Sequence, residues 1–181
     1  MIQTTPQRGA GLVLKALQFS ARKHRDQRRK GSKRYPYINH PIALVHVLWF
    51  EGGVRDGVTI AAALLHDTLE DTQTSAQELR GHLGKTVTEV VEEVTDTKFL
   101  KKESRKRVQI ARAGHSTRRA RLVKQADKIC NLRDMLADPP AGWPIERVRK
   151  YFDWAKRVVD ETRGTSEPLE RHFDRLYRQR P

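Results

Sequence analysis

A short apolar segment, residues 56–65, is the feature that most constrains the fold of this chain. It contains the run Ile60-Ala-Ala-Ala-Leu-Leu65, and apolar side chains lie nearly all round it when it is drawn as a helix. A helix without a polar face needs other elements on every side, so we expect a central, buried helix. The segment ends in His66-Asp67, and an acidic turn, Thr68-Leu-Glu-Asp71, follows. The sequence therefore predicts a buried helix that ends in polar side chains.

Apolar residues recur with helical spacing along most of the chain, and no segment alternates like a strand. The pattern predicts a first helix that carries Val13 and Leu17 and a last helix that carries Leu169, Phe173 and Leu176. Between them it predicts further helices over about 39–51, 101–111, 118–135 and 145–163. We therefore predict an all-α fold, a compact multi-helix bundle. Residues 1–181 are expected to form a single domain, with a flexible N-terminus over residues 1–8.

Local signals indicate where some of these helices begin and which face is apolar. Asn39 is expected to cap the second helix, and its apolar stripe is expected to consist of Ile42, Val45, Leu48 and Trp49. Ser75 and Thr86 are each followed by Glu three residues later. This capping-box pattern predicts a helix start at both positions.

The charge of the chain indicates a polyanionic partner. Its 181 residues include 36 Lys and Arg against 22 Asp and Glu, a net charge of +14. The basic residues cluster, with eight in segment 22–34 and six in segment 98–107, each beside a single acidic residue. The single cysteine, Cys130, excludes an internal disulfide, is expected to be a packed thiol, and fits a reducing cytoplasm. No apolar stretch approaches the ~18 residues needed to span a membrane.

Four side chains form a candidate metal site. His66 and Asp67 close an apolar helix, where a charge needs a partner or a metal ion to offset its desolvation. His40 and Asp127 can complete the ligand set. Two imidazoles and two carboxylates suit Mn²⁺, Fe²⁺ or Zn²⁺ and are too rich in nitrogen for a typical Ca²⁺ or Mg²⁺ site. Four protein ligands would fill tetrahedral Zn²⁺, whereas octahedral Mn²⁺ keeps room for water and a phosphate oxygen, so we favour one Mn²⁺ ion.

Two further carboxylates, Glu70 and Asp71, follow the His-Asp pair by about one helical turn. If the helix continues, they lie on the same face as the pair. A carboxylate in that position is suited to act as a general base or to orient a nucleophilic water.

Five segments form a distinctive set of motifs: Gln27-Arg-Arg-Lys30, Pro36-Tyr-Ile-Asn-His-Pro41, Ala62-Ala-Leu-Leu-His-Asp-Thr-Leu-Glu-Asp-Thr72, Val91-Glu-Glu-Val-Thr-Asp96 and Leu122-Val-Lys-Gln-Ala-Asp-Lys-Ile-Cys-Asn-Leu-Arg133. Together they resemble the hydrolase domain of RelA/SpoT-type alarmone enzymes. Segment 142–155 makes the chain most similar to the stand-alone small hydrolases of the metazoan SpoT-homologue type. The resemblance implies an HD-domain bundle around a single metal site.

The resemblance also implies an activity and a set of site residues. The activity is hydrolysis of the 3′-pyrophosphate of guanosine 3′,5′-bis(diphosphate), ppGpp, and of pppGpp, which gives GDP or GTP and pyrophosphate. Manganese would be held by His40, His66, Asp67 and Asp127, while Glu70 and Asp71 would activate or position the attacking water. The implied substrate-binding residues are Arg29, Lys30, Tyr37, Lys102, Asn131, Arg147 and Tyr151.

Two other readings stay open at this point. The same metal site and basic entry would serve an HD phosphohydrolase that acts on another nucleotide, including the 2′-phosphate of NADPH. The charge of +14 alone would also fit a nucleic-acid-binding module. The chain carries no zinc-finger or RNP motif, so we expect a small nucleotide as the partner, with no specific nucleic acid and no membrane. The oligomeric state is left open.

Overall fold

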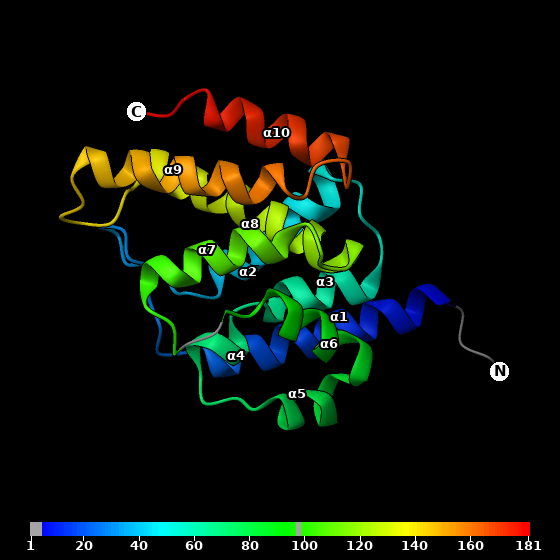
Figure 1. Ribbon diagram of the computed structural model, residues 1–181. Coiled ribbons are helices and arrows are strands. Elements are labelled where there is room, and N and C mark those ends of the chain that lie inside the picture. Colours follow the sequence, from blue (N-terminus) through cyan, green and yellow to red (C-terminus); the bar gives the residue numbers. More distant parts are fainter. Residues whose placement is uncertain (1–4, 97–98) are drawn as a thin grey trace.

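The computed structural model describes residues 5–96 and 99–181 and is an all-α bundle, which confirms the predicted fold class (Figure 1). The helices are α1 (Thr5–Lys23), α2 (Asn39–His46), the π-helix η1 (Val47–Glu51), α3 (Gly57–Leu65), α4 (Thr68–Asp71), α5 (Ala76–Leu83), α6 (Lys85–Val94), α7 (Lys102–Ala113), α8 (Arg118–Ala137), α9 (Ile145–Asp160) and α10 (Glu167–Tyr177). Within the described ranges, β pairing is limited to one isolated bridge between Arg28 and Pro36. The sequence predicts a flexible N-terminus over residues 1–8. Residues 1–4 lie outside the described residues, and residues 5–8 belong to α1, which begins at Thr5.

Helix α3 lies at the centre of the bundle, as its apolar sequence predicts. Every residue from Thr59 to Leu65 is buried. Helices α1, α2, α6 and α8 pack around it, and α8 in turn contacts α9 and α10 (Figure 1). The two central helices α3 and α8 therefore carry side chains from distant parts of the sequence into one interior. None of the helices in the described part of the chain has the length and apolar character needed to cross a membrane.

Two helix starts follow the expected side-chain chemistry. Asp56 caps α3, because its carboxylate accepts hydrogen bonds from the Thr59 amide at 3.2 Å and the Thr59 hydroxyl at 2.6 Å. Ser75 caps α5 by accepting a hydrogen bond from the Glu78 amide at 3.1 Å. Both contacts satisfy backbone donors that a helix N-terminus leaves without partners.

Two other predicted starts are wrong by one or two residues. Asn39 is the first residue of α2 rather than its cap, because the preceding Ile38 already has helical φ and ψ and makes no side-chain cap. Helix α6 starts at Lys85 rather than at a Thr86 cap, directly after Gly84, whose φ of 84° suits a residue without Cβ. In both places the preceding backbone conformation sets the boundary, and the pattern of cap residues does not reveal it.

The buried face of the second helical segment also differs from the prediction. Leu48 is buried as predicted, but Ile42 and Trp49 are 45% and 38% exposed, and Leu44 and Val47 are buried in their place. Apolar residues occupy most positions from 42 to 50. The periodicity of this segment therefore does not distinguish the face that packs against α3 and α8.

The chain changes direction at the end of α3, and this change positions the polar pair. Helix α3 ends at Leu65, His66 and Asp67 form a turn, and the single-turn helix α4 follows. The Asp71 amide donates to the Asp67 carbonyl at 2.7 Å, and this hydrogen bond closes the single turn of α4. Glu70 and Asp71 therefore do not continue α3 but lie on a separate helical turn directly after the pair.

Candidate metal centre

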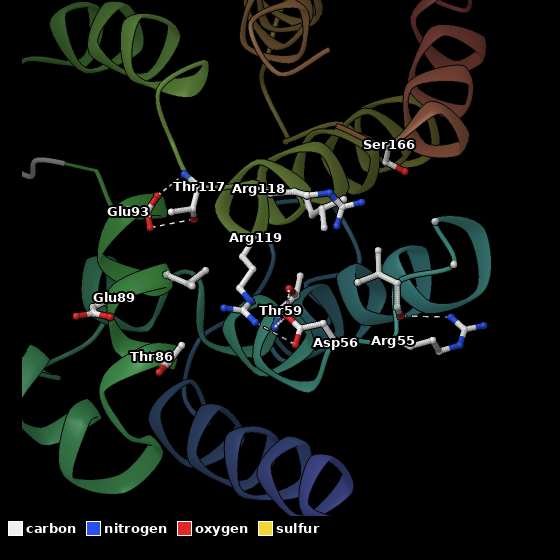
Figure 2. A pocket seen from close by; sticks show the side chains of 15 residues that line it. Arg55, Asp56, Thr59, Thr86, Glu89, Glu93, Thr117, Arg118, Arg119 and Ser166 are labelled. Carbon is white, nitrogen blue, oxygen red and sulfur yellow. Dashed lines mark hydrogen bonds and ion pairs between the residues drawn. The ribbon is translucent and has the colours of Figure 1, made fainter. Parts of the chain in front are cut away.

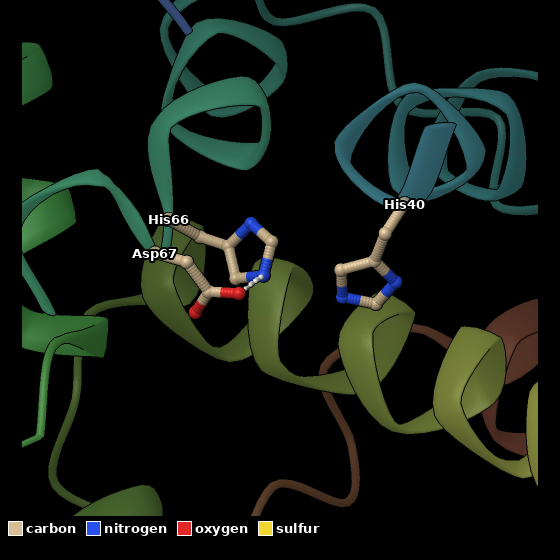
Figure 3. A group of neighbouring side chains, drawn as sticks. All are labelled: His40, His66 and Asp67. Carbon is tan, nitrogen blue, oxygen red and sulfur yellow. Dashed lines mark ion pairs between the residues drawn. The ribbon is translucent and has the colours of Figure 1, made fainter. Parts of the chain in front are cut away.

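Side chains from three helical regions meet at the carboxyl end of α3. His66 and Asp67 follow α3, His40 comes from the first turn of α2, and the rings of His40 and His66 point toward one another (Figure 3). Ligand atoms of His40, His66 and Asp67 lie within 4.8 Å of one another. Asp127 in α8 completes the group, because its Oδ1 atom is 3.3 Å from His40 Nε2 and 3.9 Å from His66 Nε2. The structure thus brings all four predicted ligands together.

The hydrogen bonding of His66 leaves one ring nitrogen available for a cation. Its Nδ1 atom lies 2.9 Å from the Ala63 carbonyl oxygen, which can only accept, so Nδ1 carries the hydrogen. The Nε2 atom is buried without a hydrogen-bond partner and lies 2.9 Å from Asp67 Oδ2. To face this carboxylate, Nε2 needs a positive charge between the two atoms, either a second ring proton or a bound cation. The residues present therefore fit a divalent cation.

The electrostatics of the centre lead to the same conclusion. Burial disfavours a charged imidazole, yet the carboxylates of Asp67 and Asp127 raise the pKa of His66 to about 9. Burial also opposes ionisation of Asp67, and the neighbouring His66 nevertheless holds the pKa of that carboxyl well below its usual range. The centre thus holds ionised carboxylates in a buried position and favours a positive charge beside them.

Residues behind the ligands hold the carboxylates in place. The Tyr37 hydroxyl donates to Asp67. Asn131 Nδ2 donates to Asp127 Oδ1 at 2.6 Å, and the buried Lys128 ammonium lies 2.8 Å from Asp127 Oδ2. Such outer contacts fix the orientation of carboxylate ligands. Lys128 directly follows a predicted ligand, but its helical context gave no reason to expect a buried ammonium at this position.

Glu70 is a partly buried carboxyl next to the centre. Its Oε2 atom accepts a hydrogen bond from the Asp96 amide at 3.2 Å, and Oε1 lies 3.6 Å from an Arg105 guanidinium nitrogen. Burial, together with the negative charges of Asp96 and Asp67, raises the pKa of Glu70 to about 7. A carboxyl group with that pKa both accepts and releases protons near neutral pH.

Asp71, the other predicted acid, lies at the exposed end of α4. Its backbone carbonyl accepts a hydrogen bond from the Gln27 side chain at 2.6 Å. This contact joins α4 to the basic segment that precedes His40. The structure therefore places Asp71 beside the entry to the centre, whereas Glu70 is the more buried of the two.

Two of the predicted substrate-binding residues, Tyr37 and Asn131, lie against the candidate ligands, and a third, Arg29, lies behind them. The Arg29 guanidinium donates to Asn131 Oδ1 at 3.2 Å, pairs with Asp134, and lies 5.6 Å from the centre of the Tyr37 ring. Because Tyr37 contacts Asp67 and Asn131 contacts Asp127, Arg29 is one contact removed from the metal ligands.

Three more of the predicted substrate-binding residues, Lys102, Arg147 and Tyr151, gather around Trp143, which the sequence pattern did not single out. The remaining one, Lys30, follows Arg29 in the loop before His40. The Arg147 guanidinium and the Lys102 ammonium lie 3.9 Å and 5.8 Å from the centre of the Trp143 ring. Burial and the charge of Arg147 lower the pKa of Lys102, with a smaller effect from Lys30. The Tyr151 ring is 6.4 Å from that of Trp143. The result is a basic rim around the half-buried Trp143 ring.

A cavity of about 730 Å³ lies at the opposite end of α3, beside its N-terminus (Figure 2). Helix α3 has nine residues, so this end is roughly 13 Å from His66. Its charged lining residues are three basic and three acidic: Arg55, Arg118, Arg119, Asp56, Glu89 and Glu93. Arg119 pairs with Asp56 at 2.7 Å. This balanced lining does not select a polyanionic ligand, so the candidate site is the metal centre.

The fold and this ligand set define the class of the protein. The family model described as "HD domain" matches residues 16–150, so the chain belongs to the HD-domain family. Within that family it belongs with the stand-alone members related to the metazoan SpoT orthologue, as the resemblance predicts.

The relatives that place it there match along nearly their whole length. The guanosine-3′,5′-bis(diphosphate) 3′-pyrophosphohydrolase MESH1 of Homo sapiens is 50% identical over 171 residues, which cover 94% of this chain and 96% of the relative. The protein of the same name from Drosophila melanogaster is 47% identical over 167 residues, 92% of this chain and 93% of its own. A solved structure, described as a metazoan orthologue of SpoT that hydrolyses ppGpp, superposes with a TM-score of 0.91 at 46% identity, covering 93% of this chain and 95% of that one.

Proposed function

We propose that this protein is a metal-dependent hydrolase that removes the 3′-pyrophosphate from ppGpp and pppGpp and releases GDP or GTP. One observation carries the proposal: a buried His-His-Asp cluster lies beside Glu70, whose pKa is raised to about 7. The arrangement combines a cation site with a proton acceptor. The activity named for the human and Drosophila relatives supplies the substrate, since those relatives match over nearly the whole chain.

The proposed metal ligands are His40, His66, Asp67 and Asp127, and the proposed ion is a single Mn²⁺. The ligand chemistry supports this choice, because two imidazoles and two carboxylates suit a six-coordinate transition-metal ion. When bound, such an ion supplies Lewis acidity toward a phosphate oxygen. The buried Nε2 atom of His66, which lacks a hydrogen-bond partner, supports the presence of a cation at this position.

We assign proton transfer to Glu70 and the positioning of water to Asp71. With its pKa raised to about 7 by burial and the neighbouring carboxylates, Glu70 can exist in both protonation states near neutral pH. The ionised form accepts a proton from the attacking water as its oxygen bonds to phosphorus. The protonated form can return that proton to the 3′ oxygen as the bond from that oxygen to phosphorus breaks. Arg105 holds the carboxyl in place through its contact at 3.6 Å.

The basic rim is proposed to bind the two diphosphate groups. Arg29 and Lys30 enter from the segment before His40, while Lys102 and Arg147 flank Trp143. Guanidinium groups bind phosphate oxygens with two hydrogen bonds, which gives orientation as well as affinity.

Three less basic groups complete the proposed substrate site: Tyr37 and Asn131 beside the ligands, and Tyr151 beside Trp143. We also propose a cytoplasmic location, which the single buried thiol of Cys130 and the absence of any disulfide partner in the sequence support.

A product assay tests the proposal. Purified protein would be incubated with Mn²⁺ and ppGpp, and the products separated by anion exchange, with NADPH tested in parallel. We expect GDP and pyrophosphate from ppGpp, and loss of turnover in His66→Ala. The exposed His115 provides the matched control, His115→Ala, which should keep full activity. Release of phosphate from NADPH without turnover of ppGpp would replace the proposed substrate and keep the metal site.

A further inference from the structure

Two loops meet beside the basic rim, and Asp138 joins them. One loop precedes His40 and carries Lys30 and the tip Gly31–Arg34, and the other begins at Asp138, directly after α8. Asp138 Oδ1 accepts hydrogen bonds from the Ser32 amide at 3.0 Å and the Ser32 hydroxyl at 2.8 Å. Asp138 Oδ2 accepts from the Lys33 amide at 3.3 Å. One carboxylate thus binds three donors from the tip of the other loop.

The close approach of the two loops depends on Gly31. A Cβ atom at this position would overlap the Asp138 carboxylate, at 2.8 Å from its Cγ, and would lie 3.0 Å from the Asp138 carbonyl oxygen. Arg34, three residues on, has a φ of +47°, which is an uncommon conformation for a residue with a Cβ. The tip therefore adopts a tight, locally unfavourable shape, and the contacts with Asp138 offset its cost.

The loop tip is connected to the candidate site through its own backbone. The Arg29 amide donates to the Tyr35 carbonyl at 2.9 Å, and the Tyr37 amide donates to the Gln27 carbonyl at 3.0 Å. These bonds make the loop a narrow hairpin, so the placement of its tip affects the Arg29 and Lys30 side chains at its base. Asp138 itself lies five residues before Trp143.

We propose that Asp138 is a positioning residue that clasps the basic loop 29–34 to the loop carrying Trp143 and so preorganises the phosphate-binding rim. The inference rests on the proposed function for the identity of the substrate. Asp138 acts through the loops, because its carboxylate is occupied by the Ser32 and Lys33 donors. Loss of the clasp lowers the fraction of molecules in which the rim has the conformation that binds substrate. The apparent affinity decreases in proportion to that fraction, while the rate of the chemical step is unchanged.

Steady-state kinetics with ppGpp test the clasp from both loops. We expect Asp138→Ala and Gly31→Ala each to raise KM by roughly three- to tenfold while kcat stays within about twofold. Asp138→Asn should fall in between, since its amide oxygen can still accept from Ser32. In an Asp138→Ala background Gly31→Ala should have a smaller effect than in the wild type, because the carboxylate that it would overlap is gone and only the close contact with the carbonyl oxygen of residue 138 remains. The matched control is Asp26→Ala. Asp26 is an exposed acidic residue that precedes the loop and pairs with Arg25.

Limited trypsin digestion, followed by mass spectrometry, measures how accessible loop 29–34 is to the protease and does not depend on enzyme activity. Asp138→Ala and Gly31→Ala should speed cleavage after Lys30, Lys33 and Arg34, whereas Asp26→Ala should not. Unchanged cleavage would overturn the clasp, and faster cleavage with unchanged KM would overturn the positioning role. A loss of kcat alone would also contradict it. If the wild-type protein did not hydrolyse ppGpp, the proposed function would fail, and the digestion result would still decide whether the clasp exists.

Discussion

Glu70→Gln should remove activity and stabilise the metal-free protein, because the fold keeps this carboxyl in an unfavourable environment. The pKa of Glu70 rises from its ordinary value of 4.5 to about 7, through burial and the charges of Asp96 and Asp67. Since a tenfold change in proton affinity is worth about 1.4 kcal/mol, this rise corresponds to about 3.5 kcal/mol. Solvent screening of the partly exposed carboxyl lowers the cost of the ionised form to about 2–3 kcal/mol. Gln removes that charge and can keep the hydrogen bond from the Asp96 amide.

The sign of the pH dependence follows from the direction of the shift. The folded protein binds the Glu70 proton more tightly than the unfolded chain does, so its contribution to stability is present below pH 4.5 and is lost as pH rises toward 7. In urea denaturation with EDTA, Glu70→Gln should match the wild type at about pH 5 and exceed it by about 2 kcal/mol at about pH 8. Its kcat with metal should fall roughly 10²- to 10⁴-fold. Equal stability differences at the two pH values would refute the reasoning.

Three further outcomes follow from the same geometry. Asp67→Ala and Asp127→Ala should each lose the ion, measured by elemental analysis after gel filtration, together with turnover; an ion that is retained in stoichiometric amount would contradict the ligand assignment. Lys102→Ala and Arg147→Ala should raise KM for ppGpp by roughly tenfold, since each removes a charged contact, and unchanged KM in both would place the diphosphates elsewhere. Phe152→Ala, at a fully buried position of α9, should lower the free energy of unfolding by about 3–5 kcal/mol, whereas a loss below about 1 kcal/mol would contradict the packing.

The sequence predicts the helical architecture well because the signals for it are local. The apolar run before His66 indicates a central helix, and the same run explains why a polar pair at its end is unusual. The pairing of that end with His40 and Asp127 is a long-range contact, which local periodicity does not specify. Residue chemistry made His40 and Asp127 candidates, the family resemblance implied the same ligand set, and the structure brings these side chains together.

Other features depend on contacts that no local pattern records. The clasp between Gly31 and Asp138 joins loops that are separated by more than half of the chain. Trp143 is important only because Arg147 and Lys102 pack on it. A tryptophan in a proline-rich loop gives no sign of such partners. Long-range packing, rather than residue type, determines both features.

The central claim is that one metal ion in the His-Asp centre supports hydrolysis at the 3′ position of ppGpp. The most direct test is a titration of EDTA-treated protein with Mn²⁺, in which bound metal and the rate of GDP formation are measured on the same samples. We predict that the rate rises in proportion to bound metal and reaches its maximum at one ion per chain, with GDP and pyrophosphate formed in equal amounts. Full metal occupancy without GDP formation, or GDP formation that persists in EDTA, would contradict the claim.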